Sequence, residues 1–307
     1  FMHAWNQMNK ANECIYIGYD STNFNTNAQG IELADYGHPK VDEGLPQYNL
    51  AYAVNQKDST PLFYELYDGS VIDNTELEIM LEEAKEFGHE RRGVLMDRGY
   101  ISEKNIKALR SKRYEYILMM KQNQKICQEI IEEYGAAVQS LEGYYIGEHG
   151  VYGTTVKKQL YGQETNIHVY YDDIRASEEK IALMSRYETW EKEIEKKVAK
   201  KIATEGEMKK YRKVFKLKYD QNGYLVAYQR NSRYIKEEIR NLGFFFIITS
   251  EDMSASKALD IYRGRDNIEK MFRSLKSGID FNKARVHTTE SLKSKVFVTF
   301  YEIYCKL

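Results

Sequence analysis

Three acidic residues that are far apart in the sequence, Asp20, Asp97 and Glu269, occupy positions from which their carboxylates could come together in the fold. Asp20 ends the apolar run CIYIGYD, Asp97 follows the buried-strand candidate GVLM, and Glu269 lies inside an amphipathic helix pattern. Taken singly, an Asp at a strand end more often serves a turn or a helix cap. Carboxylates that meet within a few ångströms repel one another and are normally held by divalent cations. Since Mg²⁺ combines a few carboxylate oxygens with waters and substrate phosphate, such a triad indicates phosphoryl transfer by two metal ions.

The segment YRGRDNIEKMFRSLK, residues 262–276, predicts an amphipathic helix with a narrow polar strip. Its apolar face consists of Ile268, Phe272 and Leu275. At about 100° per residue, four other side chains fall within roughly 60° of one another on the helical wheel, and these are Tyr262, Arg265, Glu269 and Lys276. A strip this narrow would let an acid, two cations and a tyrosine face one bound group.

The composition predicts a soluble globular protein without a membrane span. The chain has 307 residues, of which 42% are hydrophobic and 30% charged, enough for a sizeable core in one large or two smaller domains. No apolar run approaches the roughly 18 residues that a spanning helix needs, and the N-terminus lacks a signal-peptide pattern, so we expect a cytoplasmic location. Cys14, Cys127 and Cys305 form no C-x-x-C pair, which argues against a disulfide framework and a zinc site.

The charges are unevenly distributed along the chain. A net charge of −1 gives the whole protein no obvious affinity for nucleic acid. From Lys257 to Leu307, however, eleven Lys or Arg stand against six Asp or Glu, and a second basic cluster runs from Lys192 to Lys218. Within 192–201 the interleaved glutamates favour a solvated helix face with ion pairs over a binding surface.

The order of elements predicts an α/β core interrupted by an insertion. The first part has apolar runs typical of strands at 14–20, 50–56, 61–69, 93–96 and 114–121, with helices at 73–88 and after Ser102. Alternating Gly- and Tyr-rich runs then predict hairpins, and a long charged helix is expected at 175–203. A Gln-Asn-Gly turn after this helix predicts one more hairpin. The run GFFFIITS returns to a buried-strand composition, and Ser254 or Ser256 can cap the helix that follows. We therefore predict a core in two parts, 14–121 and 243–307, and an inserted mainly-β region with a long charged helix, 122–242.

The segments YIGYDSTNF, GVLMDRGYIS and YRGRDNIEKMFRSLK together resemble the acidic motifs of DDE transposases of bacterial insertion sequences. The resemblance is to the group whose last motif is Y-x₂-R-x₃-E-x₆-K, which the polar strip matches without a gap. Asp-Ser-Thr at 20–22 and Asp-Arg-Gly-Tyr at 97–100 are similar to that group's first two acidic motifs. The resemblance runs from about Cys14 to the end of the chain and is weak through 122–242. Three motifs in order are a more specific match than the last motif alone.

This resemblance implies a ribonuclease H-like core, a mixed sheet with flanking helices, interrupted by a largely β insertion. It implies that Asp20, Asp97 and Glu269 coordinate two Mg²⁺ or Mn²⁺ ions for DNA cleavage at element ends and strand transfer into target DNA. The DNA contacts that it implies near the cleavage point are Tyr262, Arg265, as a bidentate phosphate clamp, and Lys276. The implied partner is double-stranded DNA, both transposon ends and target, bound by a homodimer at the bacterial nucleoid.

Several alternatives stay open from the sequence. Arg285 and His287 are candidate DNA contacts, with a solvated loop as an equal alternative, and Arg98 and Tyr100 could orient the substrate or simply cap and pack. The rival functions are a ribonuclease H-like nuclease without strand transfer and a DNA-binding remnant without catalysis. The chain begins shortly before its first strand pattern, stops inside an apolar helix pattern and has no recognisable N-terminal site-specific DNA-binding domain. We therefore expect a fragment of a longer protein or a decayed copy.

Overall fold

The computed structural model describes residues 1–8, 16–37, 44–71, 73–89, 93–200, 206, 208–266 and 285–306. The chain divides into two compact units. Unit 1 comprises residues 1–121, 155–168 and 246–307, and unit 2 comprises residues 122–154 and 169–245. The predicted division into two core parts and an insertion at 122–242 stays a prediction.

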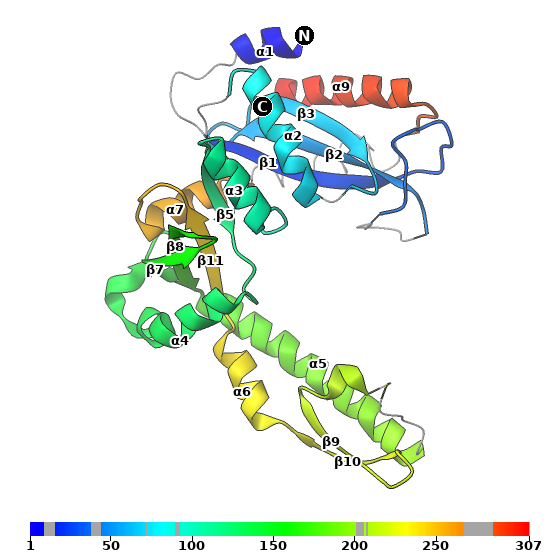
Figure 1. Ribbon diagram of the computed structural model, residues 1–307, viewed down its shortest axis with the longest axis vertical. Helices are drawn as coiled ribbons and strands as arrows, with labels where there is room; N and C mark the ends of the chain where they lie inside the picture. The colour runs from blue at the N-terminus through cyan, green and yellow to red at the C-terminus, as the bar shows by residue number, and fades with distance from the viewer. Residues whose placement is uncertain are drawn as a thin grey trace. The chain divides into compact units, whose positions relative to one another are not determined.

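A mixed β-sheet is the framework of the fold (Figure 1). Within the described residues its nine strands follow the order β3 (Pro61–Asp68), β2 (Gln47–Asn55), β1 (Tyr16–Asn25), β4 (Gly93–Met96), β5 (Glu115–Met119), β11 (Phe244–Thr249), β8 (Gln163–Tyr171), β7 (Val151–Leu160) and β6 (Tyr145–Ile146). β1 runs antiparallel to β2 and parallel to β4, β4 runs parallel to β5, and β5 runs antiparallel to β11. The predicted mixed α/β fold is therefore confirmed, while the ribonuclease H-like core stays a prediction.

Several strands are buried along their whole length, and two of them, β4 and β11, have nearly uninterrupted apolar sequences. β2, β4 and β11 are buried at every position, so both faces of the sheet are covered there. Helix α9 (Thr289–Lys306) covers β2 and β3 in unit 1 (Figure 1), and the rings of Tyr52 and Phe300 stack with their centroids 6.1 Å apart. Helix α1 (Met2–Met8) joins this core through Trp5, whose indole N–H donates to the carbonyl of Pro61 at 2.7 Å.

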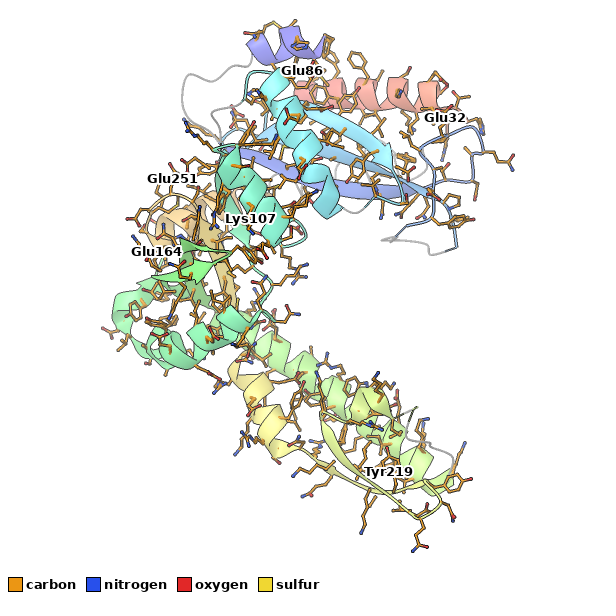
Figure 2. All side chains as sticks on the ribbon, viewed as in Figure 1. Glu32, Glu86, Lys107, Glu164, Tyr219 and Glu251 are labelled. Carbon is orange, nitrogen blue, oxygen red and sulfur yellow. The ribbon has the colours of Figure 1, made fainter. Side chains whose placement is uncertain are left out.

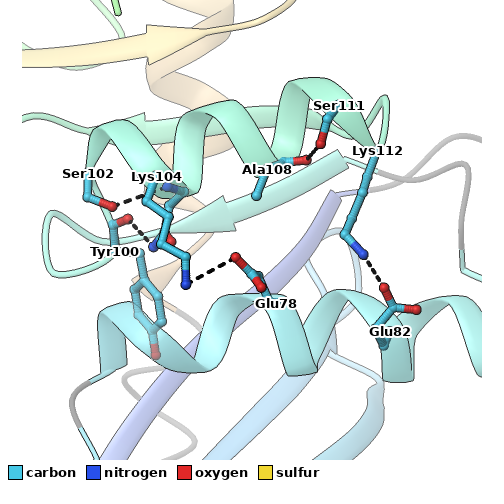
Figure 3. A network of polar contacts seen from close by, with 9 residues as sticks. Glu78, Glu82, Tyr100, Ser102, Lys104, Ala108, Ser111 and Lys112 are labelled. Atoms are coloured by element: carbon cyan, nitrogen blue, oxygen red, sulfur yellow. Dashed lines mark hydrogen bonds and ion pairs between the residues drawn. The ribbon is translucent and has the colours of Figure 1, made fainter.

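Helices α2 (Asp73–Glu86) and α3 (Glu103–Ser111) lie side by side in unit 1 (Figure 3). Lys104 pairs with Glu78 at 3.1 Å, and Lys112 pairs with Glu82. Surface ion pairs of this kind contribute little to stability, so burial of the apolar faces of the two helices matters more. α3 begins at the predicted cap, because the Ser102 hydroxyl accepts from the backbone N–H of Asn105 at 3.2 Å.

The chain that leaves β11 is fixed to the start of β1 by Glu251, which Figure 2 labels. The hydroxyl of Tyr16 donates to the Glu251 carboxylate, and the side chains of Asn166 and Thr249 donate to the Glu251 carbonyl at 3.0 and 2.7 Å. Helix α7 (Ala255–Arg263) follows, with Ser254 as the predicted cap that accepts from the backbone N–H of Lys257. This linkage joins the segment that leads into α7 to the start of β1.

Unit 2 combines three further helices with a two-stranded ribbon. The helices are α4 (Lys125–Ser140), α5 (Asp173–Lys200) and α6 (Ser232–Arg240), and the ribbon is formed by β9 (Phe215–Tyr219) and β10 (Leu225–Arg230). The predicted long charged helix and the Gln-Asn-Gly hairpin are present, but α4 was not predicted, and 122–242 is more helical than its alternating runs suggested. The signal for α4 was the helical spacing of its buried Cys127, Ile130, Ile131 and Val138. No helix in the described part of the chain is long and apolar enough to cross a membrane.

Candidate active site

The register between two parallel strands brings Asp20 and Asp97 together. Gly18 lies opposite Leu95 in the pairing of β1 with β4, and the two acids each follow two residues later along the same direction. β4 ends at Met96, so Asp97 is the first residue beyond it, whereas β1 continues to Asn25 along β2. The prediction that Asp20 ends its strand is therefore wrong, because the polar residues after it still pair with β2. Asp20 instead lies just beyond the end of the pairing between β1 and β4.

The turn after β4 holds the Asp97 carboxylate in place. Its Oδ1 accepts from the backbone N–H of Gly99 at 2.6 Å, an Asx turn that the Asp-Arg-Gly sequence favours. A Cβ on residue 99 would lie 2.8 Å from that oxygen, so glycine lets the carboxylate keep this position. Tyr100 is buried and its ring meets Tyr19 edge-on at 5.7 Å, whereas Arg98 is exposed. Of the two roles considered for Tyr100, the structure places it in the core.

Arg265 connects the end of α7 with Asp20. One guanidinium nitrogen lies 3.3 Å from Asp20 Oδ2, and another donates to the Tyr262 hydroxyl at 3.1 Å. The pair is largely sequestered from solvent, since the side chains of Arg265 and Asp20 are 13% and 17% exposed. Tyr262 is buried as well, at 7% exposure. Of the predicted polar strip, Arg265 therefore contacts the first acid directly, and Tyr262 contacts Arg265.

Electrostatics link Asp97 to the same group. Burial opposes the charge of the Arg265 guanidinium, but Tyr262, Asp20 and Asp97 outweigh it and raise the pKa of Arg265 above its usual value. Burial also raises the pKa of Tyr262; Asp97 and Asp20 add to this shift, while Arg265 opposes it. Tyr262 is thus neutral and Arg265 cationic at neutral pH. The site consists of two carboxylates, one guanidinium that offsets their repulsion, and a phenol that holds the guanidinium.

The helix that carries Arg265 differs from the prediction. A single helix was expected over 262–276, but α7 ends at Arg263, and Gly264 and Arg265 form a turn. The backbone N–H of Arg265 donates to the Tyr262 carbonyl at 3.0 Å, which keeps the two side chains adjacent without a regular helix. The prediction is wrong at this point because Gly264 is a poor helix former. Glu269 and Lys276 lie outside the described residues.

Comparison with known families identifies the chain. Residues 17–300 match the family model described as Transposase DDE domain. The chain belongs to this transposase family. The matched range includes the two described acids, Asp20 and Asp97, and also Tyr262 and Arg265.

Two other comparisons add little to this assignment. A search of curated proteins finds no match to this chain. Among solved structures, the chain is similar to one described as the piggyBac transposase synaptic complex with hairpin DNA, with a TM-score of 0.46 and 7% sequence identity. That similarity covers 94% of this chain and 46% of the other, so the DDE domain spans about half the length of that protein. A match this weak carries no argument about function.

The two described aspartates of the DDE domain have the type of ligand atom, a carboxylate oxygen, that divalent cations prefer. Oxygen ligands from aspartate are those that Mg²⁺ and Mn²⁺ prefer, and the ion pair with Arg265 shows that positive charge is already accommodated against Asp20. Asp20 and Asp97 could each supply such an oxygen. No group of three or more His, Cys, Asp or Glu side chains suited to a metal occurs among the described residues. The third predicted ligand, Glu269, lies outside them.

Arg285 and His287 lie at a different place in the DDE domain, on the segment that leads into α9. Thr288 on this segment bridges to Gly30, and the backbone N–H of Thr289 donates to the Gly30 carbonyl at 3.1 Å. Both Arg285 and His287 are exposed, and Arg285 has a positive φ of 48°. A role for either side chain in binding DNA stays a prediction.

Sequence reasoning missed Gln56, which positions the end of α7. Its side-chain amide donates to the Ile261 carbonyl at 3.2 Å, and its backbone N–H donates to the Tyr16 carbonyl at 2.9 Å. A Cβ on Gly264 would lie 2.0 Å from the Gln56 amide nitrogen. The signal was Gly264 itself, because a glycine within a helical pattern often marks a close approach of another group.

Proposed function

We propose that this DDE domain is the catalytic part of a transposase that cleaves DNA at the ends of a bacterial insertion sequence and joins the freed end to target DNA. The observation that supports this most is that adjacent parallel strands place Asp20 and Asp97 side by side, with the cationic Arg265 from the end of α7 paired to Asp20. The proposal includes a ribonuclease H-like core, a homodimer on paired DNA ends, and a cytoplasmic location at the nucleoid.

Cleavage and joining are two phosphoryl transfers at one site. In cleavage, a water oxygen attacks the phosphorus, the bond from phosphorus to the 3′ oxygen breaks, and that oxygen leaves as a hydroxyl. In joining, this 3′ hydroxyl loses its proton and attacks the phosphorus of a target phosphodiester, the bond from that phosphorus to the target 3′ oxygen breaks, and the target strand leaves with a protonated 3′ hydroxyl. Asp20, Asp97 and the predicted ligand Glu269 would hold two Mg²⁺ or Mn²⁺ ions, whose chemistry would be to activate the attacking oxygen and to stabilise the leaving oxygen.

The remaining residues bind and orient the DNA. Arg265 presents a planar fork of donors that suits a phosphate, and its contact with Tyr262 keeps this fork in one orientation. Because Tyr262 is buried, we assign it this positioning role instead of stacking on a base. Lys276, Arg285 and His287 are proposed as further DNA contacts. The double-stranded substrate comprises the element end and the target.

An end-labelled DNA assay tests the function. The chain is incubated with duplexes carrying element ends, with and without Mg²⁺, and both cut and joined products are resolved. We expect metal-dependent cutting followed by joining, and we expect Glu269→Gln to abolish both while folding and metal-free DNA binding persist. Cutting without joining would instead indicate a ribonuclease H-like nuclease. Binding without any Mg²⁺-dependent cutting would indicate a remnant without catalysis.

A further inference from the structure

The strands β9 and β10 in unit 2 form an antiparallel two-stranded ribbon (Figure 1). Asp220 closes its turn, because Oδ1 accepts from the backbone N–H groups of Asn222 and Tyr224, both at 2.9 Å. Gly223 has a φ of 80°, which favours glycine at this position. The ribbon is therefore formed in advance and does not need a ligand to order it.

The two faces of the ribbon differ in character. Phe215 and Leu225 are buried in the core of unit 2, together with Tyr187 and Ile194 of α5. Strand alternation in β9, and in β10 after the register shift between Leu225 and Ala227, places four exposed side chains on the other face, and these are Lys216, Lys218, Ala227 and Gln229. Lys216 lies opposite Gln229, and Lys218 lies opposite Ala227. We call these four residues the outer face; they combine two cations with a small apolar group and an amide.

The charge of this segment is strongly one-sided. Residues 208–230 contain seven Lys or Arg, and Asp220 is their only acid. Two of the cations are paired within unit 2, Lys210 with Glu193 and Arg230 with Glu191. Lys216 and Lys218 have no ion pair with any described residue and point to solvent. Their charge is therefore available to an external polyanion.

We propose that the outer face enters the major groove of duplex DNA, with Lys216 and Lys218 on phosphates and Gln229 on a base edge. This inference rests on the proposed function, since it names how the same protein would engage its DNA. The major groove of B-form DNA is about 12 Å wide and admits a two-stranded ribbon. Lysines two apart on a strand are separated by about 7 Å, close to the rise across two phosphates of one DNA strand. Gln229 can read adenine through paired hydrogen bonds, and Ala227 can contact a thymine methyl group.

Duplex DNA fits this surface better than other polyanions. The major groove of double-stranded RNA is deep and narrow, so a ribbon cannot reach its base edges. Lys216 and Lys218 alternate with Leu217, which is half-buried and belongs to the core of unit 2. The outer face itself therefore holds two cations, an amide and one methyl group, with Val226 exposed beside it, and cations suit the phosphates that line a groove.

The test measures binding by the whole chain without divalent metal. Fluorescence anisotropy with a duplex selected from a random-sequence pool is recorded at several salt concentrations, alongside double-stranded RNA of the same sequence. Lys216→Ala/Lys218→Ala should lower the slope of log affinity against log salt by about 1.8, because each phosphate contact contributes about 0.9. Gln229→Ala should leave the slope unchanged and reduce discrimination at one base pair by about 5- to 150-fold, the range for one bidentate contact.

The matched control is Lys192→Ala/Lys196→Ala, which removes the same charge from the exposed side of α5 in the same unit. The inference is overturned if the ribbon variant and this control have the same slope, or if RNA binding depends on Lys216 and Lys218 as strongly as DNA binding does. Mg²⁺-dependent cleavage is measured separately. Cleavage that persists with unchanged binding in the ribbon variant contradicts the ribbon alone, whereas ribbon-dependent binding without any cleavage contradicts the proposed function alone.

Discussion

The buried His168 of β8 predicts a specific dependence of stability on pH. Its Nδ1 lies 2.8 Å from the Thr155 hydroxyl of β7, and its Nε2 lies 3.0 Å from the Thr249 hydroxyl at the end of β11. Thr249 donates to the carbonyl of Glu251, so it accepts from Nε2–H, and Nδ1 then accepts from Thr155. This hydrogen-bond network assigns the neutral tautomer. Burial lowers the pKa of His168 to about 4, with Asp252 acting in the opposite direction.

The sign of the effect follows from the two states. An unfolded histidine titrates near pH 6.5, so as pH falls the unfolded chain binds this proton before the folded one does. The contribution of His168 to the free energy of unfolding is full above pH 6.5 and is lost as pH falls towards 4. Linkage gives a loss of about 2 kcal/mol between pH 7 and pH 5, and about 3 kcal/mol once both states are protonated.

Urea unfolding at pH 7 and pH 5 measures this loss in the wild type and in His168→Gln. Glutamine can donate and accept but does not titrate, and the carboxylates common to both proteins cancel in the comparison. The wild type should lose about 2 kcal/mol more than His168→Gln between the two pH values. His287→Gln, at an exposed histidine, should follow the wild type. If wild type and His168→Gln lose the same free energy, burial does not govern the protonation of His168.

Three further predictions concern the end of α7 and the acids. Arg265→Ala should weaken metal-free DNA binding and lower its salt slope by about 0.9, as measured by titration at several salt concentrations; an unchanged slope would show that Arg265 contacts no phosphate. Asp97→Asn should leave that slope unaltered and remove Mg²⁺-dependent cleavage in the end-labelled assay, and persistent cleavage would contradict its role as a metal ligand. Gly264→Ala should lower the melting temperature and the cleavage rate, because its Cβ would displace the Gln56 amide. Gly143→Ala, where a Cβ meets nothing within 4 Å, is its control, and equal effects of the two would contradict this role for Gly264.

The main elements of the core could be predicted because local pattern and burial agree there. GVLM and FFFIIT form buried strands, and Ser102 and Ser254 cap the predicted helices. Helix α4 was not predicted because the segments that follow it alternate in a pattern typical of strands. Its own buried residues nevertheless have helical spacing. Strand partners could not be predicted in full, since the pairing of β5 with β11 joins residues far apart in the chain.

The candidate site shows the same division between local and tertiary information. Asp97 was identifiable because a buried strand stops immediately before it and Gly99 permits the turn that holds its carboxylate. The end of α7 was not, since it depends on the amide of Gln56, which is remote in sequence. The sequence predicted that Arg265 and Asp20 belong to one site, but it did not predict the direct ion pair between them. Neither spacing nor composition indicates that the arginine would take one of the two oxygens of the acid.

That contact has a consequence for how the site assembles. Two carboxylates that adjacent strands place side by side repel each other, and the repulsion is stronger where solvent is partly excluded. Arg265 offsets it without a metal, since it is 13% exposed and its pKa is raised by both acids and Tyr262. Removing the guanidinium leaves buried negative charge uncompensated. Arg265 therefore supplies, in the absence of metal, the positive charge that both acids require, and its contact with the Tyr262 hydroxyl holds it beside Asp20.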